Sequence, residues 1–523
     1  MSFSFSVIAS SPDLSAQSAE LPLPASEQIG PLYIQEYRVT GADKLPAVEV
    51  EEAVYPYMGP GRSEVDVENA RAALESAYHE KGFQSVAVEV PEQTARGGVI
   101  VLNVVEAPVG RLRVRGSRFY DIDEIKRRVP SLAEGNVPNF NDVAREIVEV
   151  NQLADRRVAP SLNAGFEPGT VDVELTVEDT FPLHGSLELN NRYIANTTPL
   201  RLNGTISYGN LWQLGHTIGF SFQIAPEELD DAQVYSLYYI ARAPQIPWLS
   251  AMFTATRQNS NISTLGGSAV AGNGEIIGGR LMATLPSRYD GFYHSLSFGL
   301  DYKHLEQDLQ FTDQLIATPI TYYPFTLSYN AAKATELSIT ELNAGVTWAF
   351  SGAGSDAREF DNRRFNSDGS FLYLRGDLAH TQDLPYGFQL YGQAQGQTSG
   401  QALVDSEQFA IGGLDTVRGY LEAEALGDNA FVSTIEARSP ALSDFYGIDE
   451  WRIYAFWDYG LTTLNDPLPQ QTSRFELASI GAGSRLQLFD YLYGSVDAGL
   501  PLISQSNTAE GDWRVTFRLW GEF

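Results

Sequence analysis

The chain has 523 residues, of which 43% are hydrophobic and 11% aromatic, with no cysteine and a formal net charge of −31. This length predicts two or three domains, and the apolar content excludes a disordered chain. The lack of cysteine excludes disulfides and thiolate metal sites, and the negative charge argues against a nucleic-acid partner, whose phosphates would be repelled.

Residues 1–30 are rich in Ser, Pro, Ala and Glu, which predicts an N-terminal segment or linker. Met1 to Ala19 has neither the basic nor the apolar region of a signal peptide, so either the start is mature or truncated or the protein is not exported. The rest of the chain favours the first interpretation. No apolar run reaches the roughly 18 residues of a membrane helix, and the longest candidate, Gly98 to Val105, has the length of a strand.

Two small α/β segments follow, at residues 31–107 and 108–180. The spacing of apolar residues in the first predicts a strand, a helix and two strands, at Leu32–Val39, Asp66–Lys81, Val86–Val90 and Val99–Val105. The second predicts a strand, two helices and two strands, at Leu112–Val114, Ile122–Val129, Phe140–Leu153, Arg157–Ala164 and Val171–Val177. The repeated order of elements indicates an internal duplication.

Each segment would contain a small sheet with open edges, which can bind an extended peptide by strand addition. The candidate edges run from Leu32 to Val39 and from Arg157 to Ala164, although ordinary sheet structure is the more frequent explanation of such segments. Neither segment has a nucleophile–base pair, a metal cluster or a phosphate loop, and the six histidines of the chain lack metal-ligand spacing. We therefore expect no catalytic residue, no metal and no cofactor.

From Phe181 to Phe523, alternation with a period of two replaces helical periodicity. Strands of about 9–11 residues joined alternately by short and long connections predict a 16-stranded antiparallel transmembrane β-barrel. The strands are predicted to begin near Phe181, Pro199, Gly215, Asp231, Leu249, Gly274, Tyr293, Ala317, Thr335, Phe371, Gly387, Phe431, Trp451, Phe475, Leu492 and Trp513. The short connections include Ala243–Pro247 and Asp490–Tyr491, and the long ones include Asn259–Asn273, Gly352–Asp368 and Ile411–Ala430.

The last strand shows the alternation most clearly. One face carries Trp513, Val515, Phe517, Leu519 and Phe523, and the other carries Arg514, Thr516, Arg518 and Glu522. Lipid against one face and a wet lumen against the other explains this pattern. An edge strand of a soluble β-sandwich is the alternative, but it does not account for roughly 340 residues of the same alternation.

The alternation also assigns charged side chains to the lumen. On the thirteenth predicted strand, Trp457 and Tyr459 belong to the apolar lipid face, so Asp458 points inward. On the twelfth strand, Phe431 lies outside, which puts Glu436 inside as well.

Four short motifs occur on these elements. Val417-Arg418-Gly419-Tyr420 lies on a Gly-rich connection that strand counting makes the sixth outer loop, and Phe456-Trp457-Asp458-Tyr459-Gly460 lies on strand thirteen. Val90-Pro91-Glu92-Gln93 precedes the last strand of the first segment, and Pro168-Gly169-Thr170 opens the closing hairpin of the second. Together they resemble the motifs of the two-partner secretion transporters (the TpsB family, hemolysin secretion/activation proteins), over roughly Leu32 to Phe523. That family has two POTRA (polypeptide-transport-associated) domains followed by a sixteen-stranded barrel.

The resemblance implies that the loop bearing Arg418 folds into the lumen and pairs with Asp458, near Phe456 and Gly460, with Glu436 as a second lumen acid. A planar guanidinium suits a two-pronged contact with a carboxylate, and glycines let a loop approach the wall closely. From the residues alone, a solvated loop arginine is an equally good interpretation.

The resemblance further implies an outer-membrane translocator of a two-partner (type Vb) secretion system, with its POTRA domains in the periplasm. An unfolded exoprotein would bind the POTRA domains and pass through the lumen without nucleotide hydrolysis. Outer-membrane lipids and the barrel assembly machinery that inserts the chain are the other expected partners. The family often carries an N-terminal plug helix, which Pro12, Pro22 and Pro24 disfavour in residues 1–30.

The main alternative is an outer-membrane protein insertase of the same superfamily, which would act on other barrels. Two POTRA-like segments instead of a longer array favour secretion. A passive porin would lack the duplicated α/β segments, and an enzyme is disfavoured because no Gly-x-Ser-x-Gly motif is present.

Overall fold

The structure is a computed structural model that describes residues 32–93, 96–243, 246–260, 262–263, 270–271, 273–306, 308–311, 314–442 and 447–523. The predicted N-terminal segment and the middle of the turn Ala243–Pro247 lie outside the described residues.

The chain divides into two compact units. The first takes the residues up to Val114 together with Lys126–Val148 and Pro160–Leu175, and the second takes Arg115–Ile125, Glu149–Ala159 and Thr176–Phe523. This division runs through residues 108–180, so the predicted boundaries of the second α/β domain stay a prediction.

The first α/β segment has a three-stranded sheet in the order β2-β5-β4 and a two-stranded sheet of β1 and β3. Its elements are β1 Leu32–Ile34, β2 Glu36–Thr40, α1 Ala47–Val54, β3 Gly59–Arg62, α2 Glu64–Glu80, β4 Val86–Glu89 and β5 Val99–Glu106. Helix α2 buries Val67, Ala70, Leu74 and Tyr78, which lie at the predicted helical spacing. The side chain of Gln93 accepts from the backbone of Val101 at 2.7 Å and donates to it at 2.8 Å, as a neighbouring strand would.

One detail predicted for this segment is wrong, and one element was missed. Leu32–Val39 is not one strand, because the chain changes sheets at Gln35: Leu32 lies opposite Arg62 of β3, whereas Val39 lies opposite Leu102 of β5. Helix α1 was not predicted, because its eight residues between two prolines are too few to show a helical period.

A capping box begins helix α2. The backbone N–H and the hydroxyl of Ser63 donate to Asp66 at 2.8 and 2.9 Å. These hydrogen bonds, the backbone one first, hold the pKa of the Asp66 carboxyl below its ordinary value. Because the pKa is lower in the folded state than in the unfolded state, ionised Asp66 stabilises the helix start above the ordinary carboxyl range. This contribution is lost as pH falls through the folded pKa.

In an Asp66→Ala variant, we therefore expect the first turn of α2 to exchange its amide hydrogens faster than wild type at pH 7, after correction for intrinsic rates. The difference between the two proteins should shrink as the pH is lowered through the carboxyl range. Equal protection of this turn at pH 7 would contradict the assignment.

The second α/β segment has all five predicted elements. They are β6 Val109–Arg115, α3 Ile122–Arg127, α4 Phe140–Val150, β7 Arg156–Ala164 and β8 Val171–Asp179. The sheet order β6-β8-β7 leaves β7, with Arg157 and Ala164, at an edge. Pro160 within β7 suits an edge position because proline cannot donate to a ladder.

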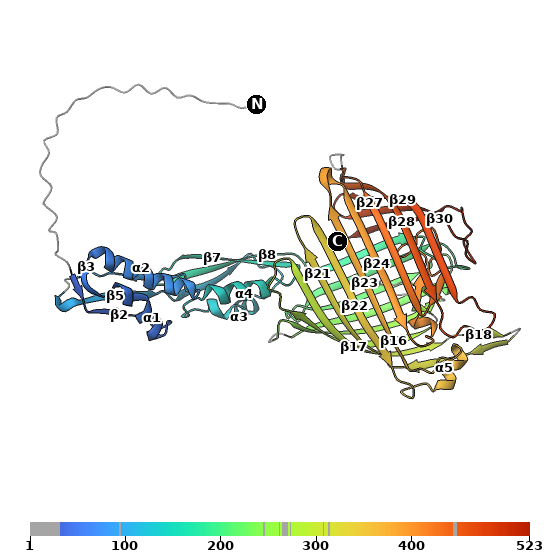
Figure 1. The fold of residues 1–523 in the computed structure, drawn as a ribbon, viewed down its shortest axis with the longest axis horizontal. Helices are drawn as coiled ribbons and strands as arrows, with labels where there is room; N and C mark the ends of the chain where they lie inside the picture. The colour runs from blue at the N-terminus through green and yellow to red at the C-terminus, as the bar shows by residue number, and fades with distance from the viewer. Residues whose placement is uncertain are drawn as a thin grey trace, which may run out of the picture. The chain divides into compact units, whose positions relative to one another are not determined.

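The remainder of the second unit is the predicted closed antiparallel barrel (Figure 1). Its strands are β9 Leu183–Asn190, β10 Arg201–Leu211, β11 His216–Ile224, β12 Ala232–Arg242, β13 Leu249–Ser260, β16 Asn273–Leu285, β17 Phe292–Glu306, β20 Ile320–Tyr322 with β21 Phe325–Ala334, β22 Ser338–Ala349, β23 Phe371–Asp383, β24 Gln389–Ser399, β27 Asn429–Arg438, β28 Ile448–Thr463, β29 Arg474–Leu488, β30 Leu492–Pro501 and β31 Arg514–Glu522. Because β20 and β21 both pair with β17, they form one interrupted strand, and the barrel has sixteen strands. Pairing of β31 with β9 closes the wall.

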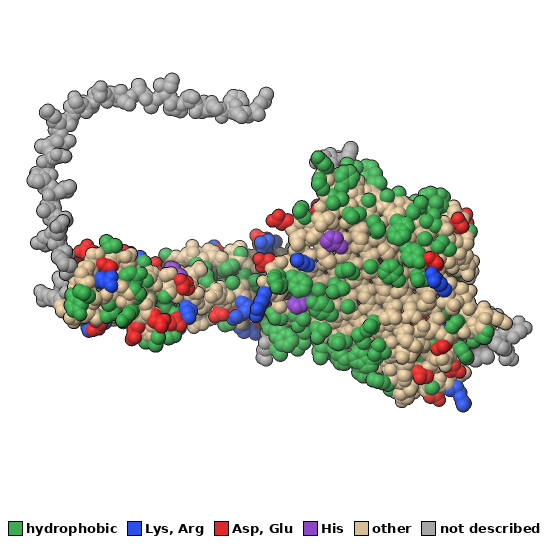
Figure 2. Space-filling model, viewed as in Figure 1, with side chains coloured by type: hydrophobic (Ala, Val, Ile, Leu, Met, Phe, Trp, Pro, Cys, Tyr) green, Lys and Arg blue, Asp and Glu red, His purple; other side chains and the backbone are tan. Residues whose placement is uncertain are grey.

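Short elements occupy the outer connections of the barrel. They are β14 Ile262–Ser263, β15 Val270–Ala271, β18 Asp308–Phe311, β19 Gln314–Ala317, α5 Ala357–Arg363, β25 Phe409–Ile411 and β26 Ala425–Gly427. Hydrophobic side chains are spread over the barrel wall (Figure 2). On β28, for example, Ile453 and Trp457 are exposed while the intervening Tyr454 and Phe456 are buried, so the predicted lipid and lumen faces are confirmed. Within the described residues, no helix is both long enough and apolar enough to span a bilayer.

Candidate functional site: the sixth loop in the barrel lumen

The connection between β24 and β27 follows the eleventh strand, which makes it the sixth outer loop, as strand counting predicted. Its flanks pair as a short hairpin of β25 and β26. The segment between them is buried: Val417 and Tyr420 are at most 1% exposed, although neither belongs to a regular element. The loop therefore folds back into the lumen.

Arg418 grips Asp458 with its side chain and its backbone. Its Nε and Nη2 donate to the two carboxylate oxygens at 2.8 and 2.9 Å, and its backbone N–H donates to Oδ2 at 3.1 Å. Asp458 is completely buried and projects from β28, the thirteenth strand. The two-pronged geometry is the one that a guanidinium and a carboxylate favour, and it fixes the loop backbone as well as the side chain.

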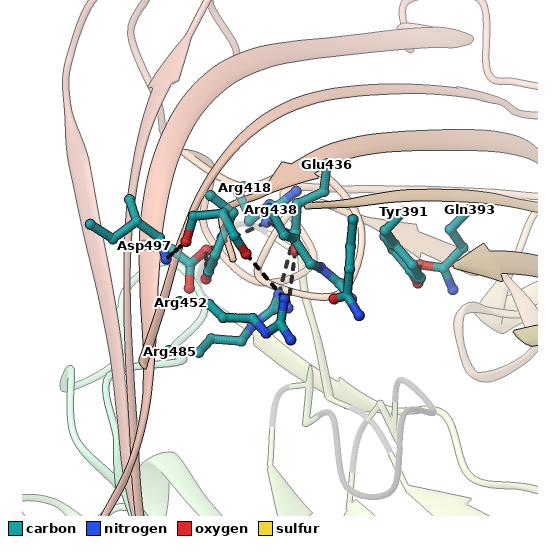
Figure 3. A network of polar contacts seen from close by, with 12 residues as sticks. Tyr391, Gln393, Arg418, Glu436, Arg438, Arg452, Arg485 and Asp497 are labelled. Carbon is teal, nitrogen blue, oxygen red and sulfur yellow. Dashed lines mark hydrogen bonds and ion pairs between the residues drawn. The ribbon is translucent and has the colours of Figure 1, made fainter. Parts of the chain in front are cut away.

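Two further carboxylates share the same guanidinium (Figure 3). Nη1 of Arg418 donates to Glu436 on β27 at 2.9 Å and to Asp497 on β30 at 3.4 Å. Arg438 and Arg485 pair with Glu436 at 2.6 and 3.0 Å. Three arginines thus face three acids. The three acids and Arg418 are buried, whereas Arg485 is exposed, and the nearby cations compensate the charge of the buried carboxylates.

Aromatic rings complete the setting of Arg418. Its guanidinium carbon lies 3.5 Å from the ring centroid of Phe456, so the cation stacks on the ring face. The hydroxyl of Tyr454 donates to Asp497 at 2.7 Å. The guanidinium is therefore held on its edge by acids and on its face by a ring.

The neighbours of Arg418 pack closely against the wall. A Cβ at Gly460 would lie 2.7 Å from a methyl group of Val417, so only glycine admits this valine. Gly419 has a φ of 91° and lies against the backbone of Gly499. The hydroxyl of Tyr420 donates to the Ile503 carbonyl at 2.7 Å. Every residue of the motif thus has a defined contact.

The loop is also tied to the first strand. Arg192, two residues after β9, donates to Glu422 at 2.8 Å and to Asp415 at 2.5 Å. These pairs attach the tip of the loop, defined as residues 409–427, to the segment that follows the first strand, at which the barrel closes.

The structure brings together the lumen residues that the sequence singled out: Val417, Arg418, Gly419, Tyr420, Glu436, Phe456, Asp458 and Gly460. The candidate edge residues Leu32, Val39, Arg157 and Ala164 belong instead to the α/β segments. Sequence reasoning missed Asp497, although it lies next to the lipid-facing Val496, and alternation on that strand turns it inward. Gly499 was also missed, because no sequence signal connects it to a loop about 80 residues away.

Three features together define a class of outer-membrane proteins with POTRA domains. They are the α/β segments, the barrel of sixteen strands that follows them, and an inward loop held by a buried arginine. The family model for haemolysin secretion/activation proteins ShlB/FhaC/HecB matches residues 169–486, and the ShlB-type POTRA domain matches residues 32–107. The chain belongs to this family, and its place is the bacterial outer membrane, with the POTRA region in the periplasm.

Similar curated proteins are named outer membrane transporter CdiB. The protein from Escherichia coli O6:K15:H31 is 26% identical over 182 residues, which are 35% of this chain and 31% of that protein. The protein from Dickeya dadantii is 22% identical over 387 residues, which are 67% of this chain and 62% of that protein. The chain therefore matches between about a third and three fifths of the length of these relatives.

Solved structures of similar fold cover nearly the whole chain. CdiB from Escherichia coli has a TM-score of 0.67 at 21% identity and covers 96% of this chain and 93% of its own. CdiB from Acinetobacter baumannii has a TM-score of 0.60 at 15% identity, covering 95% and 91%. BamA from Haemophilus ducreyi lacking POTRA domains 1–3 has a TM-score of 0.57 at 13% identity, covering 94% and 100%.

Proposed function

We propose that this protein is the outer-membrane translocator of a two-partner secretion system. An unfolded exoprotein binds the POTRA segments by adding a strand to an open edge, for which β7 and β2 are candidates. It then passes through the barrel lumen to the outside. The domain boundaries that accompany this proposal are 31–107, 108–180 and 181–523.

The sixth loop carries this proposal. Arg418 on its tip contacts three acids, from strands twelve, thirteen and fifteen. The strands of the wall are held by their own ladders, so this ionic contact is not required to hold the barrel together. Charge-assisted contacts of this kind hold an element in one position but can be exchanged for another set of partners. A loop held in the lumen by an exchangeable ionic contact suits a pore that must admit a polypeptide and then close.

The test compares the extracellular proteins of a wild-type strain and a strain that lacks this protein. We expect one large exoprotein to disappear from the medium and to return when the gene is restored. Loss of several outer-membrane barrels, with no missing exoprotein, would contradict secretion and favour the insertase. An unchanged medium with a defect in solute uptake would favour a porin.

A further inference from the structure

A second buried ionic contact holds the sixth loop at its root, defined as residues 400–408. Glu407, only 1% exposed, accepts from Lys303 at 2.6 Å, from Tyr322 at 2.6 Å and from Tyr373 at 2.9 Å. These partners come from β17, β20 and β23, which belong to the seventh, eighth and tenth strands. The acids that hold Arg418 come from the twelfth, thirteenth and fifteenth strands, so the two contacts use different sectors of the wall.

The root is also joined to the loops beside it. Arg363 at the end of α5 lies 3.2 Å from Asp405 and donates to the Leu305 carbonyl at 3.2 Å. Asp428, at the other end of the loop and fully buried, accepts from the backbone of Leu403 at 2.9 Å and of Asn465 at 2.6 Å. The root is therefore part of a small folded assembly of outer loops.

Root and tip pack in separate hydrophobic clusters. The root cluster consists of Leu305, Ile320, Tyr322, Ala349, Phe360, Phe371, Tyr373, Leu403 and Val404. The tip cluster consists of Phe409, Ile411, Val417, Tyr420, Ala425, Val432 and Leu477. Because the two clusters share no residue, one can open while the other stays packed.

We propose that Glu407 is a positioning residue that fixes the root of the sixth loop, so that translocation moves the tip while the root stays in place. This role rests on the proposed function, since it specifies which part of the loop yields to the client. A buried carboxylate with three donors on three strands is costly to release, because a released root would leave Lys303 and two tyrosine hydroxyls without their acceptor. The contacts of Arg418, in contrast, can break while Glu407 keeps all three of its donors.

The absence of native cysteine allows single thiol reporters. Val404→Cys reports on the root and Ile411→Cys on the tip, since both side chains are at most 1% exposed. In isolated outer membranes without client, Glu407→Gln is expected to raise maleimide labelling of the root reporter at least about tenfold and to leave the tip reporter unchanged. Arg418→Ala should raise labelling of the tip reporter and leave the root reporter protected. Tyr373→Phe removes one donor to Glu407 and should raise maleimide labelling of the root reporter by a smaller factor. This second variant provides the test if Glu407→Gln fails to assemble.

Unchanged root labelling in both Glu407→Gln and Tyr373→Phe would overturn the inference, as would an equal rise at both reporters, which would mean general loosening. A root that loosens in Glu407→Gln without any loss of secretion would also overturn its role in translocation. Labelling is measured without client, so it judges the root contact even if the wild-type protein proves not to secrete. Failure of the proposed function and failure of this inference are therefore distinguishable.

Discussion

An Arg418→Ala variant is expected to reach the outer membrane as a folded barrel and yet to lose most of its secretion activity. The sixteen strands are held by their own ladders, none of which includes Arg418, so the wall does not depend on the residue. The loop does depend on it, because Arg418 contacts Asp458, Glu436 and Asp497 from one side chain.

The size of the effect follows from the burial of the acids. Asp458 is completely buried and accepts three hydrogen bonds from Arg418, two of them from the charged guanidinium. Removing one partner of a buried pair costs about 3–5 kcal/mol, because the other charge is left uncompensated. Glu436 keeps Arg438 and Arg485, so the penalty falls mainly on Asp458 and Asp497. We expect a loop tip destabilised by this amount to leave its position in the lumen, while the root stays in place.

The measurement is the amount of exoprotein in the medium, normalised to folded barrel in the membrane, where folding is read from the altered gel mobility of unheated protein. We expect at least a tenfold loss, because about 1.4 kcal/mol already corresponds to a factor of ten and the cost of the unpaired charge is larger. Arg358→Ala is the matched control, because Arg358 is an exposed arginine on α5. Normal secretion by Arg418→Ala at normal abundance would remove the ionic contact from the mechanism.

A Gly499→Ala variant should have a comparable effect through steric repulsion, without any change of charge. A Cβ at Gly499 would lie 2.6 Å from the backbone nitrogen of Gly419, 2.7 Å from its Cα and 3.0 Å from the carbonyl carbon of Arg418. All three atoms belong to the backbone, so no side chain can rotate away. Either β30 or the loop has to move, and the loop is the weaker of the two because β30 is paired on both sides.

Gly494→Ala is the control for this variant. It adds the same methyl group to the same strand, but the nearest atoms would be 3.9 Å away, which is ordinary contact. We expect Gly494→Ala to secrete like wild type and Gly499→Ala to secrete poorly, with equal amounts of both barrels in the membrane. Equal secretion by the two variants would show that close seating of the loop on strand fifteen is unimportant.

The two variants address different physical contributions to one position of the loop. Arg418→Ala removes attraction and Gly499→Ala adds repulsion, and both act on the same few backbone atoms. Each variant can be combined with the tip reporter Ile411→Cys or the root reporter Val404→Cys. If maleimide labels the tip reporter more rapidly in both variants and the root reporter stays protected, the two secretion defects share one structural cause.

The sequence by itself determined the barrel, its strand number and its two faces. Alternation is a local property: successive residues of β28 face lipid and lumen in turn. The inward direction of Asp458 therefore follows from its position on the strand, without knowledge of its partner. The same rule turned Glu436 inward and made the connection bearing Arg418 the sixth outer loop. Local periodicity also found α2 and the five elements of the second α/β segment, but it failed for α1, which is too short to show a period.

Only the tertiary structure decided where the loop goes and what holds it there. A loop without regular elements has no periodicity, so its path depends on partners from strands far along the chain. Asp497 and Gly499 act on Arg418 and Gly419 from about 80 residues away, and Glu407 meets Lys303 across a separation of 104 residues. The sequence supplied inward-facing charges, and the closing of the barrel brought them within hydrogen-bonding distance, because register between strands and the curvature of the wall are properties of the whole fold.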